Sequence, residues 1–307
     1  MSNKVTKEEL ETVNIHPNKL LRLGRKIKWL FEVYLKPQHD SVVLTRNGKL
    51  TFNSKDKTTG RILHVYRNHE YDEMYDAVKF LESKKIIDAK DESIVVDVGG
   101  YLGMSSTGFL LNGMFSKAIS FEPSPENFRL LEINRKINGL TQSMQAYNIA
   151  LSDEKGSLEF ELSTKNYGDN RVRENNTKGH FGEDSREVIS IEANTFDAFL
   201  EENSEIEQEK IKLIWIDIQG HEGRFFKGAK QFFLKHKNVP VATEFWPYGI
   251  ERSGVSKEEY LQVVQELFNS FYLLNEYDTM YKIEELEKFY NAHPSGGDGL
   301  NLLLLNL

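Results

Sequence analysis

The fold is decided by one stretch, IVVDVGGYLG at residues 94–103. Its apolar first half predicts a buried strand, its glycines predict a loop, and the residues up to about 113 predict a helix. Glycine lets the backbone approach a ligand closely and adopt conformations that other residues avoid. In a doubly wound sheet, a loop at the carboxyl end of a strand lies where ligands bind. A tight turn without a ligand is the alternative, because the pattern alone is a weak signal.

Apolar runs and helical patterns alternate after this loop. The near-continuous apolar run LIWIDI (213–218) predicts a strand that is buried on both faces. Other strands are expected at 118–122 and near 144–149, 157–162, 188–192, 239–245, 270–274 and 300–306. Helices are expected at about 125–138, with Gly139 as a C-cap, near 196–200, from 222 onward and over 257–268. The alternation predicts an α/β fold, with a parallel sheet covered by helices on both faces.

Residues 1–75 predict an extension of a different kind, placed before a main domain at 76–307. Residues 41–52 predict a hairpin with Asn47-Gly48 at its turn, and RILHVY (61–66) predicts a further strand. Residues 19–36 predict a basic amphipathic helix, which we expect to pack on the main domain. Docking on a membrane surface or a partner is the alternative. Its apolar face contains Leu20, Leu23, Ile27, Leu30, Phe31 and Tyr34.

Composition excludes several classes of function. The 307 residues contain no cysteine, which excludes disulfides, thiol catalysis and cysteine-ligated metal centres. The net charge of −8 argues against a nucleic-acid partner, because phosphate binding needs a concentrated positive surface. No apolar run is long enough to span a membrane, and no early segment resembles a secretory signal. We therefore expect a cytoplasmic protein.

An acidic residue follows the second predicted strand, in the sequence FEPSP at residues 121–125. Glu122 lies some two dozen positions after the glycine loop, close to the roughly 20 residues typical of nucleoside-binding units. A carboxylate in this place accepts hydrogen bonds from ribose hydroxyls, so the pair predicts an adenosine cofactor. The loop has the pattern D-x-G-G-x-x-G, whereas dinucleotide-binding loops have G-x-G-x-x-G. Asp97 would repel a pyrophosphate and attract the positive groups of S-adenosylmethionine.

The chain resembles the FkbM family of methyltransferases in a set of stretches that occur in family order. These are VVDVGGYLGMSS (95–106), FEPSPENFRLLEINRKIN (121–138), NIALSDEKGSLEF (148–160), WIDIQGHEGRFFKGA (215–229) and, more loosely, TEFWP (243–247). The resemblance implies a class I methyltransferase (Rossmann-like) fold, with a mostly parallel seven-stranded sheet. Its antiparallel last strand would be NLLLLNL (301–307), after the GGDG loop (296–299). It also implies methylation of a hydroxyl oxygen by S-adenosylmethionine, often on a sugar or a small natural product.

The resemblance also assigns cofactor-binding roles to positions of this sequence. The glycine loop would surround the methionine part, and a serine in the following helix would bind its carboxylate. The acid after the second strand would hold the ribose, and residues after the third strand would border the adenine. The predicted residues are Asp97, Gly99, Gly100, Tyr101 and Gly103, then Ser105 and Ser106, then Glu122, Pro123 and Ser124, then Asn148 and Ala150, and finally Asp217.

Methylation of a hydroxyl benefits from a base that removes its proton. Asp217 is the first choice, because it lies at the end of the fourth core strand. His221, Glu222 and Glu244 are further candidates, and His221 titrates nearest to neutral pH. Each of the four also has a structural interpretation, such as capping a helix or lying exposed on its first turn. A magnesium or calcium site at Asp217, Glu222 and Glu244 is a further alternative, but no compact ligand motif is present, and no metal is expected.

The acceptor site is expected in two segments. The polar loop 163–186 contains Arg171 and Arg173, which suit an anionic acceptor such as a phosphorylated sugar. A mobile polar loop without such a role is the alternative. Trp246, Pro247 and Tyr248 would form a wall of the acceptor pocket or belong to the core. Tyr167, Asn170, His180 and Phe181 also lie in the loop.

Two other functions remain open from the sequence. A nicotinamide-dependent oxidoreductase uses a similar sheet, and a non-catalytic protein could keep the cofactor pocket as a scaffold. The expected partner is a sugar or another small molecule, and a homo-oligomer is compatible with the sequence.

Overall fold

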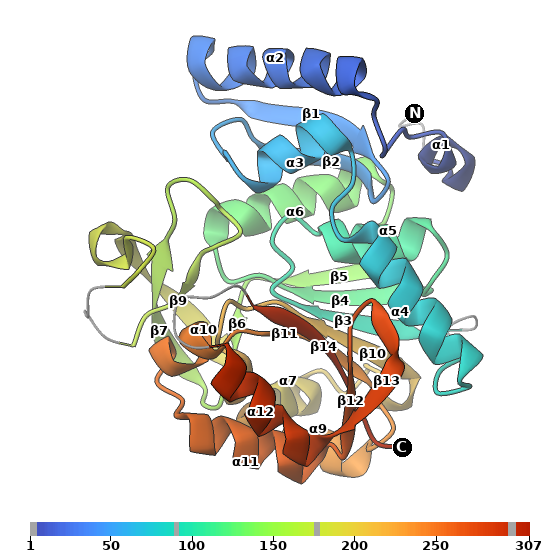
Figure 1. The fold of residues 1–307 in the computed structure, drawn as a ribbon, viewed down its shortest axis with the longest axis vertical. Coiled ribbons are helices and arrows are strands. Elements are labelled where there is room, and N and C mark those ends of the chain that lie inside the picture. The colour runs from blue at the N-terminus through green and yellow to red at the C-terminus, as the bar shows by residue number, and fades with distance from the viewer. Residues whose placement is uncertain (1–4, 89–91, 175–178, 294–298) are drawn as a thin grey trace.

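The computed structural model describes residues 5–88, 92–174, 179–293 and 299–307. Its main sheet has eight strands in the order β13-β12-β14-β11-β10-β3-β4-β5 (Figure 1). Five of them, β5, β4, β3, β10 and β11, are parallel to their neighbours within this group. The bounds are β3 Ile94–Val98, β4 Lys117–Phe121, β5 Met144–Tyr147, β10 Ile211–Ile216, β11 Val241–Phe245, β12 Ser270–Leu273, β13 Glu276–Lys282 and β14 Leu300–Leu305.

The expected antiparallel last strand is confirmed. β14 lies between β11 and β12 and is antiparallel to both. The expected number of seven strands is exceeded by β13, which forms an antiparallel hairpin with β12 at the edge of the sheet. The sequence EYDTMYK of β13 is mostly polar and largely exposed, so it contains no apolar run that would predict a strand. The GGDG loop lies outside the described residues except for Gly299.

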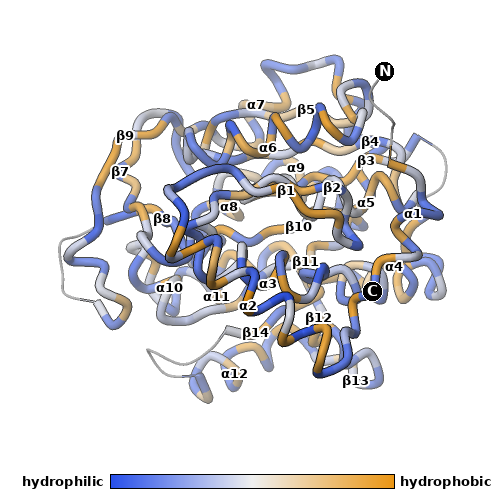
Figure 2. The backbone as a smooth tube through the Cα atoms, turned by 90° about the horizontal axis from the view of Figure 1, so that it is seen from above, coloured by the Kyte–Doolittle hydropathy of each residue, from blue (hydrophilic) through white to orange (hydrophobic). Residues whose placement is uncertain are grey.

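Two apolar cores cover the two faces of the main sheet. Alternate residues of β3 point to opposite faces, so Val96 packs in one core and Val95 in the other. In Figure 2, β10 is coloured as hydrophobic and lies inside the molecule, as its apolar sequence predicts. One face is covered by α4 Tyr71–Ser83, α5 Met104–Leu111 and α6 Pro125–Ile137. The other is covered by α7 Phe196–Glu202, α8 Glu222–Gly228, α9 Lys230–Lys235 and α11 Lys257–Leu267. The remaining helices of this half are α10 Pro247–Arg252 and α12 Leu286–Ala292.

A second, four-stranded sheet lies beside the main sheet, in the order β6-β9-β7-β8. The strands expected near 157–162 and 188–192 belong to it, because they pair with each other in an antiparallel ladder. The bounds are β6 Ala150–Leu151, β7 Gly156–Leu162, β8 Arg171–Val172 and β9 Glu187–Asn194. The expected loop 163–186 therefore contains the short strand β8.

The N-terminal extension is a hairpin accompanied by three helices. It consists of α1 Lys7–Glu11, α2 Lys19–Leu35, β1 Asp40–Thr45, β2 Gly48–Asn53 and α3 Thr59–Tyr66. The hairpin is present, but its two-residue turn is Arg46-Asn47, and Gly48 begins β2. Gly48 is needed for packing: its φ is +132°, and a Cβ atom there would lie 2.6 Å from Thr107 Cγ2 of α5.

The strand predicted at residues 61–66 is wrong, because this segment forms helix α3. Two contacts, one tertiary and one local, outweigh its β-type composition. The hairpin exposes an apolar face, and Leu63 and Val65 of α3 pack in the same core as Phe52. Asp56 also accepts the backbone N–H of Thr58 at 2.9 Å, which helps the first turn to form.

Helix α2 packs on α3 by the face opposite to the one expected. Trp29 and Val33 are buried in the core of the extension. The apolar residues that were expected to face the main domain are exposed on the outer side. Among the described helices, none is long and apolar enough to cross a bilayer.

Two asparagine side chains, one in α6 and one at its C-cap, dock the free edge of β2 onto the main domain. Asn134 accepts the N–H of Thr51 at 2.6 Å and donates to its carbonyl oxygen at 3.1 Å. Asn138 accepts the N–H of Lys49 at 2.9 Å and donates to its carbonyl oxygen at 2.7 Å. Asn134 also donates to Leu102 O at 2.8 Å. These bonds pair backbone groups that would otherwise be left without partners.

Replacing Asn134 with alanine should lower the free energy of unfolding by about 2–3 kcal/mol, because buried backbone groups of Thr51 and Leu102 lose their partners. Lys136→Ala, on the exposed side of the same helix, is the control and should change it by less than about 0.5 kcal/mol. Urea unfolding followed by tryptophan fluorescence measures both. Equal effects would contradict a docking role for Asn134.

Candidate active site

A cavity of about 350 Å³ lies at the carboxyl ends of β3, β4, β10 and β11. Each strand end contributes to its lining: Gly99, Glu122 and Asp217 directly follow β3, β4 and β10, and Glu244 is the penultimate residue of β11. The chain runs from β3 to β4 on one side and returns later to β10 on the other side. The cavity is therefore at the switch point of the sheet, where ligands of open α/β folds bind. Its size is within the ordinary range for a small-molecule site.

The glycine loop approaches the neighbouring strand end through backbone atoms alone. Gly99 has a φ of +88°, and a Cβ atom there would lie 1.9 Å from Asp217 O. A Cβ atom on Gly100 would lie 2.0 Å from Ser120 Oγ. Both glycines line the cavity, as do Tyr101 and Ser105. Gly103 does not line it; its φ of +72° serves the turn into α5.

Asp97 and Ser106 lie beneath the loop and outside the lining of the cavity. Asp97 Oδ2 accepts Ser106 Oγ at 2.5 Å, Ser106 N at 3.2 Å and Ser120 Oγ at 3.2 Å. Burial raises the pKa of Asp97 to about 6. The carboxyl group thus ties β3 to α5 and β4, and the expected electrostatic contact between Asp97 and a cofactor has no support in this arrangement.

Glu122 is buried and faces the cavity. Its Oε2 accepts the N–H of Tyr101 at 2.8 Å, and its Oε1 accepts the N–H of Ser124 at 2.8 Å. Burial raises the pKa of Glu122 to about 8. Asn127 also hydrogen-bonds to this carboxyl group, and the ionised form keeps acceptor capacity for a ligand.

The other residues predicted near Glu122 divide between the cavity and its support. Pro123 and Ala150 line the cavity, whereas Ser124 contributes only its N–H group to Glu122. Asn148 is exposed, and its side chain donates to the carbonyl oxygens of Glu122 at 2.8 Å and Pro123 at 3.1 Å. Asn148 therefore holds the segment in place, and Ile149 takes the expected position against a ligand.

Two of the four predicted bases meet in the cavity. Gln219 Nε2 donates to Asp217 Oδ1 at 2.7 Å and to Glu244 Oε2 at 3.4 Å. Burial and the charge of Glu70 raise the pKa of Asp217 to about 6. Burial and the charge of Asp217 raise the pKa of Glu244 well above its ordinary value. This end of the cavity therefore favours a cation.

His221 and Glu222, the other two predicted bases, are held by contacts within the protein. Glu222 is fully buried, does not line the cavity and accepts the N–H of Ile218 at 3.1 Å. His221 borders the cavity, but its Nε2 is hydrogen-bonded to Ser152 Oγ at 2.9 Å, and burial lowers its pKa to about 4. Within the described ranges, no group of three His, Asp or Glu residues is arranged to hold a metal ion.

The extension supplies cavity residues that the sequence did not reveal. Thr58, Thr59, His69 and Glu70 all line it. His69 Nδ1 lies 3.2 Å from Glu70 Oε1. Burial alone would lower the pKa of His69, but the charges of Glu70 and Asp217 raise it above its ordinary value. A neutral imidazole beside carboxylates is a capable base, and it lies at the cation-favouring end of the cavity.

The glycine loop and the extension are joined by a buried hydrogen bond. The phenol of Tyr101 donates to Asp56, the residue that also binds the first turn of α3. Glu70, just before α4, has a left-handed φ of +57°, an uncommon conformation that the surrounding structure maintains. The sequence has no pattern that would identify these residues, because they lie far from the glycine loop along the chain.

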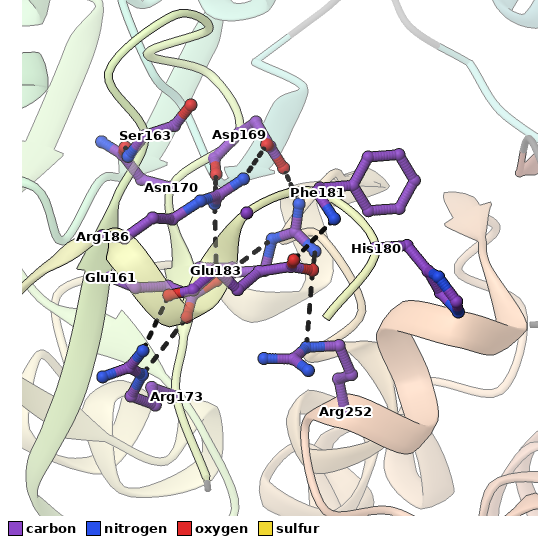
Figure 3. Close-up of polar contacts among 12 residues, drawn as sticks. Glu161, Ser163, Asp169, Asn170, Arg173, His180, Phe181, Glu183, Arg186 and Arg252 are labelled. Carbon is purple, nitrogen blue, oxygen red and sulfur yellow. Dashed lines mark hydrogen bonds and ion pairs between the residues drawn. The ribbon is translucent and has the colours of Figure 1, made fainter. Parts of the chain in front are cut away.

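The arginines of the loop 163–186 form ion pairs with buried carboxylates (Figure 3). Arg171 is only 3% exposed and lies 3.3 Å from Glu183 and 3.8 Å from Glu161, with a further ion pair to Asp169. Arg173 pairs with Glu161 at 3.4 Å. The prediction that Arg171 and Arg173 bind an anionic acceptor is therefore unsupported. Asn166, Gly168 and Asn170 are the loop residues that line the cavity.

The predicted aromatic wall is also placed differently. Trp246, Pro247 and Tyr248 do not line the cavity. Phe181 of the loop packs against Trp246 and Tyr248, with ring centroids 5.6 and 5.5 Å apart. The backbone N–H of His180 donates to the Tyr248 hydroxyl at 2.9 Å, and that hydroxyl donates to Glu183 at 2.7 Å. These aromatic residues anchor the loop, while Tyr167 packs against the core of the extension.

Comparison with known proteins finds one family model and one curated relative. Residues 97–275 match the family model of the methyltransferase FkbM domain. The 2-O-methyltransferase NoeI of Sinorhizobium fredii (strain NBRC 101917 / NGR234) is 27% identical over 161 residues, which are 49% of this chain and 63% of that protein. The match thus spans less than two thirds of that relative.

Two solved structures share parts of the fold. Methyltransferase FkbM from Methylobacillus flagellatus KT superposes with a TM-score of 0.43 and 15% identity, covering 80% of this chain and 52% of that one. P. horikoshii TYW2 in complex with MeSAdo gives a TM-score of 0.40 and 13% identity, covering 87% and 72%. At these scores, neither structure bears on the substrate of this chain.

Arg171→Ala should lower the free energy of unfolding by about 3–5 kcal/mol, because the buried carboxylates of Glu161 and Glu183 lose the buried arginine that they share. Arg129→Ala, which removes an exposed pair with Asp40 and Glu126, is the matched control and should cost less than about 1 kcal/mol. Equilibrium unfolding in urea distinguishes the two. A loss for Arg171→Ala no larger than that of the control would refute the network as a stabilising element.

Proposed function

Because the chain belongs to the FkbM methyltransferase family, we propose that it transfers a methyl group from S-adenosylmethionine to a hydroxyl oxygen of a sugar or another small molecule. The family match covers more than half of the chain and is the observation that supports methyl transfer. The cofactor is supported by the pattern of charge along the cavity. The choice of oxygen is supported by the name of one relative, a 2-O-methyltransferase.

The charges of the cavity suit a cofactor with a ribose at one end and positive groups at the other. Glu122 has free acceptor capacity for ribose hydroxyls. Glu70, Asp217 and Glu244 line the opposite part, where they would attract the ammonium and sulfonium groups. The same carboxylates would repel the pyrophosphate of a dinucleotide. Asp217, Glu244 and Glu70 thus take over the electrostatic role that the sequence assigned to Asp97.

The remaining contacts follow from the loop. Gly99 and Gly100 would let the backbone lie against the methionine part, and Ser105, in the first turn of α5, would bind its carboxylate. Ile149, Ala150 and Leu151 would border the adenine with apolar surface. When bound, the cofactor supplies a methyl carbon activated by the adjacent sulfonium.

The acceptor would enter beside the extension. Asn166 and Asn170 can donate and accept hydrogen bonds with sugar hydroxyls, and Thr59 lies 3.4 Å from Asn166. His69 would take the proton of the attacking hydroxyl, with Glu70 stabilising the imidazolium that forms. Holding the acceptor in line with the methyl carbon supplies much of the remaining acceleration.

The decisive experiment for the function measures transfer of labelled methyl from S-adenosylmethionine to a panel of neutral and anionic sugars and small hydroxyl compounds. We expect an ether product with at least one neutral acceptor. Label found only on nitrogen or carbon would refute O-methylation. Thermal stabilisation by NAD, together with none by S-adenosylmethionine or S-adenosylhomocysteine, would refute the methyl-transfer proposal itself.

Glu122→Gln should weaken binding of S-adenosylhomocysteine by about tenfold or more, because an amide replaces a carboxylate that accepts hydrogen bonds from the ribose. Glu126→Gln, four residues later and exposed on α6, should bind as tightly as the wild type. Isothermal titration calorimetry gives both affinities. Unchanged affinity in Glu122→Gln would place the ribose elsewhere.

His69→Gln should lower kcat by about 10²–10⁴-fold and leave the affinity for S-adenosylhomocysteine unchanged, because it removes the base and keeps the cavity shape. The wild-type kcat should rise with pH through a pKa above the ordinary value of 6.5, since only the neutral imidazole accepts a proton and the carboxylates raise its pKa. His236→Gln, at the C-cap of α9, is the control. A pH profile in His69→Gln with the same shape as the wild type would assign the proton transfer to another group.

A further inference from the structure

The outer face of α2 is an unpartnered apolar surface. Its six members are each at least half exposed and recur at helical spacing: Leu20, Leu23, Ile27, Leu30, Phe31 and Tyr34. The helix is held from its opposite side by Trp29 and Val33. Figure 1 shows α2 as the outermost layer of the extension, on the side away from the main sheet. In the part of the chain that the structure describes, no segment covers this face.

The charges around this apolar face are positive. Residues 19–36 contain six lysines and arginines and one glutamate, within a chain whose net charge is −8. Lys19 and Lys28 are exposed and flank the apolar face on opposite sides of the helix. Lys57 of the preceding loop of α3 lies over the ring of Tyr34, 5.8 Å from its centroid. Exposed positive charge therefore borders this apolar face at Lys19, Lys28 and Lys57.

We propose that α2 binds the surface of an anionic lipid bilayer, lying in the plane of the interface. An apolar helix face that enters the acyl boundary, with lysines at its rim that meet anionic head groups, is the arrangement by which such helices bind membranes. Helix α2 has 17 residues and would cover roughly 26 Å of the surface. A second copy of the chain fits less well, because pairing two such faces would bring their rims of like charge together.

This inference goes beyond the proposed function and does not rest on it. Lys57, whose side chain lies over Tyr34, directly precedes Thr58 and Thr59, which line the cavity.

The test is sedimentation of the full chain with vesicles of phosphatidylcholine alone or mixed in equal parts with phosphatidylglycerol. We expect the wild type to pellet with the mixed vesicles, to pellet less at high salt, and to stay in solution with phosphatidylcholine alone. The triple variant Leu23→Gln, Ile27→Gln, Phe31→Gln should lose about tenfold or more of this partitioning, because it removes apolar surface. Met280→Gln, an exposed apolar residue on β13, is the matched control and should bind as the wild type does.

Three results would overturn the proposal. One is a wild type that does not pellet with the mixed vesicles, and another is a triple variant that pellets as well as the wild type. The third is a wild-type dimer in light scattering that the triple variant abolishes, without any pelleting, which would identify a second copy of the chain as the occupant. Circular dichroism and thermal unfolding of each variant confirm that the fold is intact, so lost binding is not lost structure.

Discussion

The site depends on the close approach of two strand ends, β3 and β10, through backbone atoms. Gly99 and the carbonyl oxygen of Asp217 are so near that any side chain at position 99 would occupy the same space. This contact brings the glycine loop and Asp217 to one edge of the sheet, although more than a hundred residues separate them in the sequence. Glu122 and Glu244 reach the same edge because β4 and β11 are parallel to these strands.

The extension is the second constraint on the site. It contributes His69 and Glu70, and its position is fixed by the bonds of Asn134 and Asn138 and by the Tyr101–Asp56 hydrogen bond. The Tyr101–Asp56 hydrogen bond therefore joins the glycine loop directly to the extension beside the cavity. In the proposed reaction, most residues that hold the cofactor come from the main domain, and the base and Glu70 come from the extension.

The sequence predicted what depends on periodic patterns and missed what depends on tertiary neighbours. Apolar runs such as LIWIDI located the core strands, and the spacing of Gly99 and Glu122 located two walls of the cavity. The segment 61–66 has a strand-like composition, and only the apolar face of the hairpin makes it a helix. Arg171 resembled a ligand-binding residue because the sequence does not show that Glu161 and Glu183 are buried beside it. His69 belongs to no pattern, and folding alone brings it to the cavity.

The two asparagines at the end of α6 can both bond to β2 because the repeat of a helix nearly matches the repeat of a strand. Four residues of a helix rise about 6.0 Å, and two residues of a strand rise roughly 6.6 Å, so Asn134 and Asn138 match Thr51 and Lys49. The difference between the two rises adds up with every further pair, so this kind of helix–strand pairing is limited to a short span. It also fixes the register. Sliding β2 by one residue would turn toward α6 the backbone groups that bond to β1, and sliding it by two would move Gly48 away from Thr107. The hairpin can therefore pack on α6 in only one register.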